Sequence, residues 1–295
     1  MKKFTNESLL KITTYLEEAL KTTTSLSFVV PNPDQENNRN FKTWVNLAEL
    51  HFCTVLTPKF IDKNFIQLTF KKLNQESSFH SAPIKNKEEK YGTDSIFFNI
   101  NKNEHPTFLH AYKKALEAVK VEKRKHVLNL GINKGDEFEL IQQLIEPKVF
   151  DNMSFVGIDH SKSALDFANK RFPKENVEFF QHDINSIKEL NLEKSDLIIS
   201  IGTLQSPSIN YKPFLMSLVQ EHLSHDGAFI LGFPNSRWID GELIYGAKAP
   251  NYPYSEMSLL YNDVIFAKKY LQQKKFRVTI TGREYIFLTA TKIGL

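Results

Sequence analysis

Cysteine is almost absent from this chain of 295 residues, in which Cys53 stands alone. A single thiol excludes an internal disulfide and a metal cluster of several cysteines. It also suits a reducing compartment, so we expect a cytoplasmic protein. The nine histidines lack paired spacing, and we predict no metal site. No apolar run approaches the length that spans a bilayer, and the start at Met1 leads into a polar segment, so we expect neither a membrane partner nor a signal peptide.

Strong charge of one sign is also missing. The formal net charge is +4, and residues 1–120 hold 17 Lys and Arg against 13 Asp and Glu, whereas residues 121–295 hold 21 of each. The whole excess therefore lies in the N-terminal part of the chain. The basic residues there are spread out along the sequence, which favours a solvated surface over a nucleic-acid face.

A short apolar strand followed by a glycine turn and a helix is the most informative feature that is present. Residues 127–135 read Val-Leu-Asn-Leu-Gly-Ile-Asn-Lys-Gly, and an amphipathic helix follows at 138–145. Gly131 and Gly135 let the backbone approach a ligand closely, and the start of the helix presents unpaired N–H groups. The pattern indicates a nucleotide-binding unit of strand, turn and helix.

Four more apolar strands follow in alternation with helices. The second strand, 154–159, ends in Asp159, at the place where such folds commonly hold the two hydroxyls of a ribose. Further strands are predicted at 177–181, 196–201 and 227–233. The continuous apolar run of the fourth strand is typical of a strand that is buried on both faces of a parallel sheet.

This succession resembles a class I S-adenosylmethionine-dependent methyltransferase over residues 105–295. In that family the glycine turn follows the pattern acid-x-Gly-x-Gly-x-Gly. Here Asn129 stands at the acid position and Asn133 replaces the middle glycine. The ending of the chain also matches, because 276–280 and 285–290 predict an antiparallel hairpin added to the parallel sheet. The resemblance implies S-adenosylmethionine as the cofactor.

The resemblance also implies cofactor contacts by position. Asp159 matches the ribose acid of the family and Asp183 its adenine-contacting acid, whereas Ser200 matches a strand tip at the methionine end. Asn129 can still accept a hydrogen bond, but it brings no charge to the methionine ammonium. The implied cofactor-binding residues are Asn129, Gly131, Asn133, Gly135, Asp159, His160, Asp183, Ile184, Ser200 and Ile201.

The predicted fold class is α/β. We expect a Rossmann-like class I methyltransferase sheet, mostly parallel, of seven strands with a C-terminal antiparallel hairpin, plus a small N-terminal α+β accessory module. The signals of the module are helical patterns at 6–22 and 41–56 and an alternating strand at 64–72. We assign residues 1–104 to the accessory or lid module and residues 105–295 to the S-adenosylmethionine-binding methyltransferase domain.

The segment 232–254, after the fifth strand, is the expected substrate wall. It is a long stretch at the carboxyl end of the sheet, where open α/β folds place ligands, and it mixes rings, charges and prolines. We expect Arg237 to pair with an anion, Glu242 to handle a cation or proton, and Tyr245 to stack. The predicted substrate-binding residues are Gln205, Arg237, Glu242, Tyr245 and Tyr252, with catalytic roles for Glu242 and Tyr245. The alternative for this segment is a structured flap over apolar surface.

These features predict in-line methyl transfer to a small-molecule substrate, because the wall has no stripe of Arg and Lys for a phosphate backbone. Three alternatives stay open. The first is an RNA methyltransferase that binds RNA through the N-terminal module, and the second is a non-catalytic binding protein that kept the fold. The third is a nicotinamide-dependent oxidoreductase, which would require the spacing Gly-x-Gly-x-x-Gly that residues 131–135 lack. The sequence carries no signal of oligomeric state.

Overall fold

The computed structural model describes residues 1–35, 39–77, 89–247 and 255–294. The chain forms two compact units. The first unit contains Met1–Ser81 and Trp238–Ile244, and the second contains Ala82–Arg237 and Tyr245–Leu295. Residues 89–104, which the sequence analysis grouped with the N-terminal module, therefore belong to the second unit.

The first unit is a sheet with two helices packed on one face. Its strands follow the order β1-β2-β5-β3, and β4 also pairs with β5. Helical side chains such as Leu16 and Trp44 share one buried cluster with the strand residues Phe28, Leu68 and Phe70. The elements are β1 (Lys2–Lys3), α1 (Leu9–Thr22), β2 (Ser25–Pro31), α2 (Phe41–Leu50), β3 (Cys53–Val55), β4 (Lys59–Asp62) and β5 (Phe65–Lys72).

The second unit is built on a seven-stranded sheet with the order β13-β14-β10-β9-β6-β7-β8. Strands β10, β9, β6, β7 and β8 run parallel, and β14 pairs antiparallel with both β10 and β13. The predicted fold class is confirmed. The strands are β6 (His126–Leu130), β7 (Ser154–Asp159), β8 (Val177–Gln181), β9 (Ser195–Ile201), β10 (Leu223–Pro234), β13 (Phe276–Gly282) and β14 (Tyr285–Lys292).

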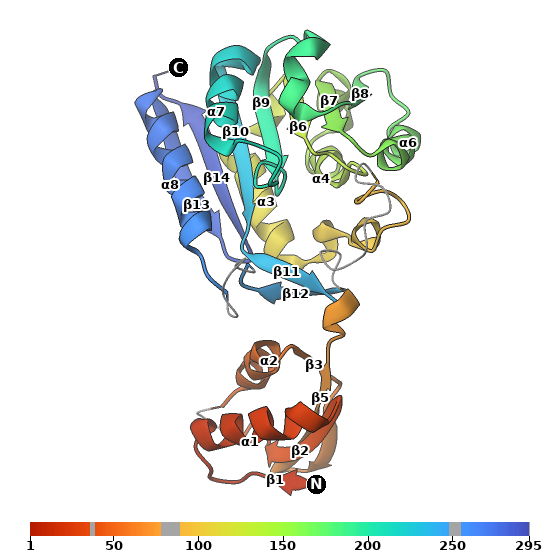
Figure 1. The fold of residues 1–295 in the computed structure, drawn as a ribbon, viewed down its shortest axis with the longest axis vertical. Helices are drawn as coiled ribbons and strands as arrows, with labels where there is room; N and C mark the ends of the chain where they lie inside the picture. The colour runs from red at the N-terminus through yellow and green to blue at the C-terminus, as the bar shows by residue number, and fades with distance from the viewer. Residues whose placement is uncertain (36–38, 78–88, 248–254, 295) are drawn as a thin grey trace. The chain divides into compact units, whose positions relative to one another are not determined.

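Helices cover both faces of this sheet (Figure 1). On one face, Phe287 of β14 contacts the rings of Phe108 and Tyr112 from α3. The next residue, Leu288, points to the other face because side chains alternate along a strand, and it shares a buried cluster with residues of α7 and α8. The helices are α3 (Pro106–Ala118), α4 (Asp136–Leu144), α5 (Pro147–Asp151), α6 (Lys162–Arg171), α7 (Tyr211–Ser217) and α8 (Ser258–Gln273).

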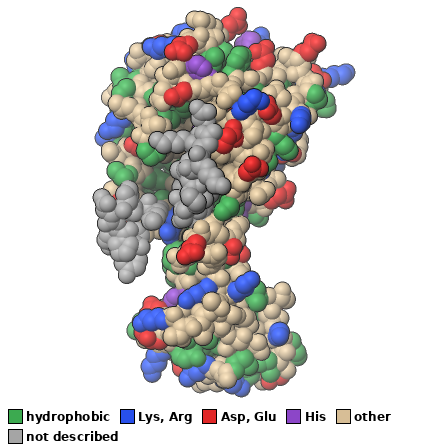
Figure 2. Space-filling view, turned by 45° about the vertical axis from the view of Figure 1, so that its right-hand side comes forward, with side chains coloured by type: hydrophobic (Ala, Val, Ile, Leu, Met, Phe, Trp, Pro, Cys, Tyr) green, Lys and Arg blue, Asp and Glu red, His purple; other side chains and the backbone are tan. Residues whose placement is uncertain are grey.

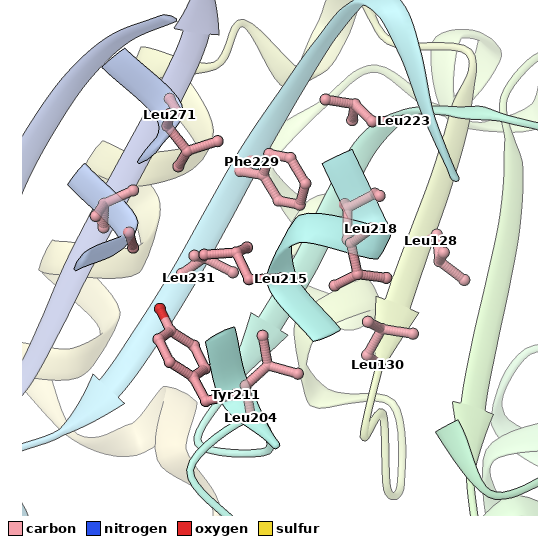
Figure 3. Packing of buried hydrophobic residues seen from close by; sticks show 14 of the residues in the cluster. Leu128, Leu130, Leu204, Tyr211, Leu215, Leu218, Leu223, Phe229, Leu231 and Leu271 are labelled. Carbon is pink, nitrogen blue, oxygen red and sulfur yellow. The ribbon is translucent and has the colours of Figure 1, made fainter. Parts of the chain in front are cut away.

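The core under α7 and α8 consists mainly of aliphatic side chains and holds the strands against these helices. Leu215 and Leu218 point toward Phe229 and Leu231 of β10, as Figure 3 shows. All four side chains are at most 1% exposed, so the carboxyl ends of β9 and β10 are held against these helices.

The segment after β10 differs from the long loop that the sequence suggested. Strands β11 (Ser236–Ile239) and β12 (Glu242–Tyr245) pair as a hairpin. Its turn is Asp240-Gly241, with φ angles of +52° and +79°. Two successive left-handed residues with the sequence Asp-Gly make the tight turn that matches strand twist. Ile239 and Ile244 pack with Leu73 inside the first unit.

No helix within the described ranges is both long enough and apolar enough to cross a membrane.

Candidate cofactor and substrate sites

The glycine turn after β6 has the left-handed backbone that its sequence requires. Gly131, Asn133 and Gly135 have φ angles of +79°, +48° and +89°. A side chain at Gly131 would place its Cβ 2.0 Å from Oγ1 of Thr203, so only glycine fits this position. Asn133 takes the middle place because asparagine tolerates a left-handed backbone better than most residues.

The side chain of Asp159, on the neighbouring strand β7, binds the backbone of the glycine turn. It is 6% exposed at the end of β7. Its Oδ2 accepts a hydrogen bond of 2.9 Å from the Asn133 N–H, and its Oδ1 accepts one of 3.0 Å from the Ser161 N–H. Each carboxylate oxygen has a further lone pair. The carboxylate is thus fixed in place and can still accept from two hydroxyl groups.

Asn129 lies two residues before the turn and is 1% exposed. Its amide Nδ2 has no hydrogen-bond partner among the described residues. A buried polar atom without a partner costs free energy unless a ligand or water satisfies it. This atom therefore points to a polar ligand group near the end of β6.

The remaining residues assigned by position lie at the ends of the neighbouring strands. Exposed Asp183 accepts a hydrogen bond of 2.9 Å from the Asn185 N–H and begins a short helix, in which Ile184 is buried. His160 is partly exposed, and its ring contacts that of Tyr91. Ser200 donates a hydrogen bond of 3.2 Å to the Leu130 carbonyl, which joins the ends of β9 and β6, and Ile201 beside it is buried.

A segment that the sequence analysis did not assign to the site lies against the glycine turn. We call residues 89–104 the strap. The Asn133 side chain donates 2.7 Å to the Tyr91 carbonyl, and the Lys134 ammonium donates 2.6 Å to the Phe98 carbonyl and 2.8 Å to that of Ile100. The turn itself therefore holds the strap through side chains that the family pattern would not predict.

The two ends of the strap are held by charged residues. Glu89 accepts hydrogen bonds from Ser161 and Ser163 at the start of α6. Burial raises the pKa of the Glu89 carboxyl, but the hydrogen bonds from Ser163 and Ser161 outweigh burial and lower it. At the other end, Lys102 pairs with Glu137 at 2.9 Å, both buried. Burial lowers the pKa of Lys102, and the Glu137 carboxylate more than reverses that shift. Such buried pairs fix geometry, because losing either partner leaves an uncompensated charge.

The turn after β9 contributes Gln205. Its Oε1 is buried and has no hydrogen-bond partner among the described residues. Thr203, two residues before Gln205, touches the position of Gly131, so this turn lies beside the glycine turn. Gln205 thus offers an unused acceptor near the methionine end of the implied cofactor.

A hollow of about 440 Å³ lies within the second unit, between the end of β12 and the start of α8. It is lined by Tyr245, Gly246, Ser255, Glu256, Met257, Ser258 and Tyr261. The Arg283 guanidinium lies 5.3 Å from the centre of the Tyr245 ring. Arg283 precedes β14, whose first residue pairs with the last residue of β10. The hollow is therefore at the carboxyl edge of the sheet, the edge that carries the glycine turn.

The structure brings only some of the predicted substrate residues to this hollow. Tyr245 lines it, and Arg237 donates a hydrogen bond of 3.2 Å to the carbonyl of Gly246 beside it. Glu242 is exposed at the start of β12, in the part of the hairpin that clusters with the first unit. Tyr252 lies outside the described residues.

The methyltransferase-domain family matches residues 121–277, which is more than half of the chain. The chain belongs to this family. It is a class I S-adenosylmethionine-dependent methyltransferase, as the sequence pattern predicted. No curated protein matches the chain.

The chain is also similar to several solved structures, among them methyltransferases. The methyltransferase domain of bacterial CtHen1-CN is 17% identical, with 63% of this chain and 99% of that chain covered at a TM-score of 0.45. The plantazolicin methyltransferase BpumL, in complex with a monoazolic desmethylPZN analog and SAH, is 13% identical over 70% of this chain and 93% of that one, with a TM-score of 0.44. TehB from Haemophilus influenzae is 16% identical over 78% of this chain and 70% of that one, with a TM-score of 0.41.

The cofactor of this methyltransferase is S-adenosylmethionine. The chemistry of the donor set fits it. Asp159 offers a fixed carboxylate for two hydroxyls, Asn129 offers a buried amide with an unused atom, and the turn between them bends through left-handed residues. Sugar hydroxyls and an amino-acid end are the groups that such donors and acceptors recognise.

Proposed function

We propose that this methyltransferase transfers the methyl group to a small molecule bound in the hollow beside Tyr245. The observation that carries the proposal is the hollow itself, since its volume of about 440 Å³ lies in the range of small-molecule sites. Two phenol rings and a thioether line it, and these suit a planar or partly apolar acceptor. Bound S-adenosylmethionine supplies a methyl group already activated on sulfur, so the protein has mainly to align the acceptor and keep out water.

In this proposal Tyr245 and Tyr261 hold the acceptor by ring contact, and Arg237 keeps the end of the hairpin in place through Gly246. Gln205, whose buried oxygen is unused, does not line the hollow and stays a sequence-based prediction of a substrate contact. The sequence analysis gave catalytic roles to Glu242 and Tyr245. Of these two, Tyr245 lines the hollow, so we give the catalytic role to Tyr245. Glu242 and Tyr252 remain sequence-based predictions. We also infer a cytoplasmic location from the single, buried and unpaired Cys53.

The test begins with calorimetry of the full chain against S-adenosylmethionine and S-adenosylhomocysteine, followed by methylation of a metabolite extract with labelled cofactor. The variant Tyr245→Ala/Tyr261→Ala should abolish labelling while it leaves the cofactor dissociation constant within about fivefold (about 1 kcal/mol). Leu259→Ala, an exposed residue of α8 that does not line the hollow, is the matched control. Unchanged labelling in the double variant would remove the hollow as the substrate site.

A second candidate function is methylation of RNA through an RNA-binding first unit. The observation that favours it is the distribution of lysine over the sheet of that unit. In an extract assay, labelled RNA in place of labelled metabolites would support this candidate against the first.

A further inference from the structure

In the described part of the first unit, one face of the sheet carries no helix. Helices α1 and α2 pack on the face that carries Leu68 and Phe70 of β5. The other face of β5 carries Gln67, Thr69 and Lys71, because side chains alternate along a strand. We call this second side the open face.

Pairing across the sheet places further lysines on the open face. Gln67 pairs with Val29 on β2 and with Lys59 on β4, and Val29 pairs with Lys3 on β1. Directly opposed residues of a sheet point to the same side. Lys3 and Lys59 therefore lie at the two ends of one row, about 14 Å apart for strands spaced about 4.8 Å. All three lysines of the open face, Lys3, Lys59 and Lys71, are exposed.

Charge is segregated between the two layers of the first unit. Strands β1 to β5 and the turn before β5 carry six lysines and a single acid, Asp62. Helices α1 and α2 together carry three lysines and three glutamates. The Asp62 carboxylate accepts from the N–H groups of Asn64 and Phe65 and thereby holds its own turn. The first unit as a whole holds ten Lys and Arg and ten Asp and Glu, so the sheet is basic and the balancing acids lie mainly outside it.

An aromatic ring accompanies these lysines. Phe65 lies on the open face two residues before Gln67, and the Lys3 ammonium lies 3.5 Å from the centre of its ring. Phe60 is 74% exposed at the sheet edge, but it pairs with Ile66 of the helical side and so does not belong to the open face. Figure 2 shows Lys and Arg side chains spaced over the visible surface of the first unit, with hydrophobic side chains between them.

We propose that the open face of the first unit binds single-stranded RNA. Separated lysines meet successive phosphates, Ser27, Gln67 and Thr69 offer hydrogen-bonding groups between them, and Phe65 offers a ring for stacking. Unpaired bases can stack on such a ring and paired bases cannot, so a single strand fits better than a duplex. The inference goes beyond small-molecule methylation and does not depend on it.

The experiment measures binding of the full chain, without cofactor, to a fluorescent 20-nucleotide RNA of mixed sequence by anisotropy at several salt concentrations. The variant Lys3→Gln/Lys59→Gln/Lys71→Gln should weaken binding at least tenfold. It should also make the slope of log K against log salt shallower by about 2, since each phosphate contact on a single strand contributes about 0.7. Phe65→Ala should weaken binding severalfold with the salt slope unchanged, because stacking releases no counterions.

The matched control is Lys11→Gln/Lys21→Gln/Lys42→Gln, which removes the same charge from the helical layer. It should leave RNA affinity within about twofold. Equal losses in both triple variants would show attraction by net charge alone and would overturn the proposal. So would absence of binding at 50 mM salt, tighter binding of duplex than of single strand, or capture by vesicles of anionic phospholipid in preference to RNA. Thermal melts of each variant establish that the first unit stays folded, and since no cofactor is present, failure here leaves the methyl-transfer proposal standing.

Discussion

Asn133 shows how one residue can depart from a family pattern and still serve the site. Its backbone takes the left-handed φ that glycine usually supplies, and its N–H reaches Asp159. Its side chain adds what glycine lacks, a hydrogen bond of 2.7 Å to the strap at Tyr91. The sequence alone indicated that asparagine would tolerate the turn. It could not indicate the contact with Tyr91, because that contact joins segments 42 residues apart.

The carboxylate of Asp159 should carry much of the affinity for the cofactor. We expect Asp159→Ala to weaken S-adenosylmethionine binding by about 1.5–3 kcal/mol, as a charge-assisted acceptor is lost. The same variant leaves the N–H groups of Asn133 and Ser161 without their acceptor and should lower the free energy of unfolding by about 1–3 kcal/mol. Asp159→Asn keeps one oxygen and should recover more stability than affinity. Calorimetry and urea melts separate the two effects, and unchanged affinity in Asp159→Ala would remove this residue from the cofactor site.

Two features exclude a side chain at Gly131: its left-handed φ angle and the nearby Thr203. Gly241 shares only the first feature and therefore serves as the control. Both have φ of +79°, but a Cβ at Gly131 meets Thr203 at 2.0 Å, whereas a Cβ at Gly241 meets nothing within 4 Å. Gly241→Ala should cost only the backbone strain, about 1–2 kcal/mol of unfolding free energy. Gly131→Ala should cost clearly more and should also impair cofactor binding. Equal losses of unfolding free energy in Gly131→Ala and Gly241→Ala, measured by urea melts, would contradict this prediction, because Thr203 would then move aside at no cost.

At the scale of elements, the strands of the second unit could be predicted from sequence because each is a short apolar run between turn residues. The cofactor positions stay predictions, which the sequence made from the family pattern because they follow these strands directly. The β11–β12 hairpin was missed although Asp240-Gly241 is a strong turn signal, since the surrounding rings and charges suggested a binding loop. The strap could not be predicted as part of the site. It is held by Lys102, Lys134 and Glu89 through contacts that are distant in sequence and show no periodicity.

As the pH is lowered, the strap should open at a higher pH than the sheet of the second unit. Hydrogen bonds from Ser163 and Ser161 hold the pKa of the Glu89 carboxyl below its ordinary value, even though burial raises it. A carboxyl whose pKa is lower in the folded state contributes stability that is complete above its unfolded pKa, about 4.3, and is lost as the pH falls through the folded value. Hydrogen exchange of residues 89–104 should therefore accelerate below about pH 4 relative to that of β6.

The matched variant for the strap is Glu89→Gln, which cannot ionise. At pH 7 its strap should exchange faster than that of the parent, and the difference should shrink as the pH falls and the parent carboxyl is protonated. Lys114→Met, which removes an exposed pair with Glu117 on α3, should leave strap exchange unchanged. A constant difference between parent and Glu89→Gln from pH 7 to pH 3 would contradict the role of the charge.

At the scale of the whole molecule, the chain returns to its first unit long after leaving it. Residues 238–244 cluster with residues 1–81, so the first unit is completed only after most of the second has been synthesised. Both tryptophans of the chain, Trp44 and Trp238, belong to the first unit and are buried. Tryptophan fluorescence therefore reports unfolding of the first unit, while cofactor binding reports on the second.

This division predicts that the two units respond separately to two different perturbations. Ile244→Ala should lower the tryptophan-detected melting transition, because loss of a buried side chain packed on Leu73 costs about 2–5 kcal/mol, and it should leave cofactor affinity unchanged. Saturating S-adenosylmethionine, at 100 times its dissociation constant, should stabilise the second unit by about 2.7 kcal/mol and move only the calorimetric transition that tryptophan does not report. Ile280→Ala, at a partly exposed position of β13, should shift neither transition by more than a degree or two. If the cofactor moved the tryptophan transition as far as the other one, the two units would unfold as one cooperative body and the prediction would be wrong.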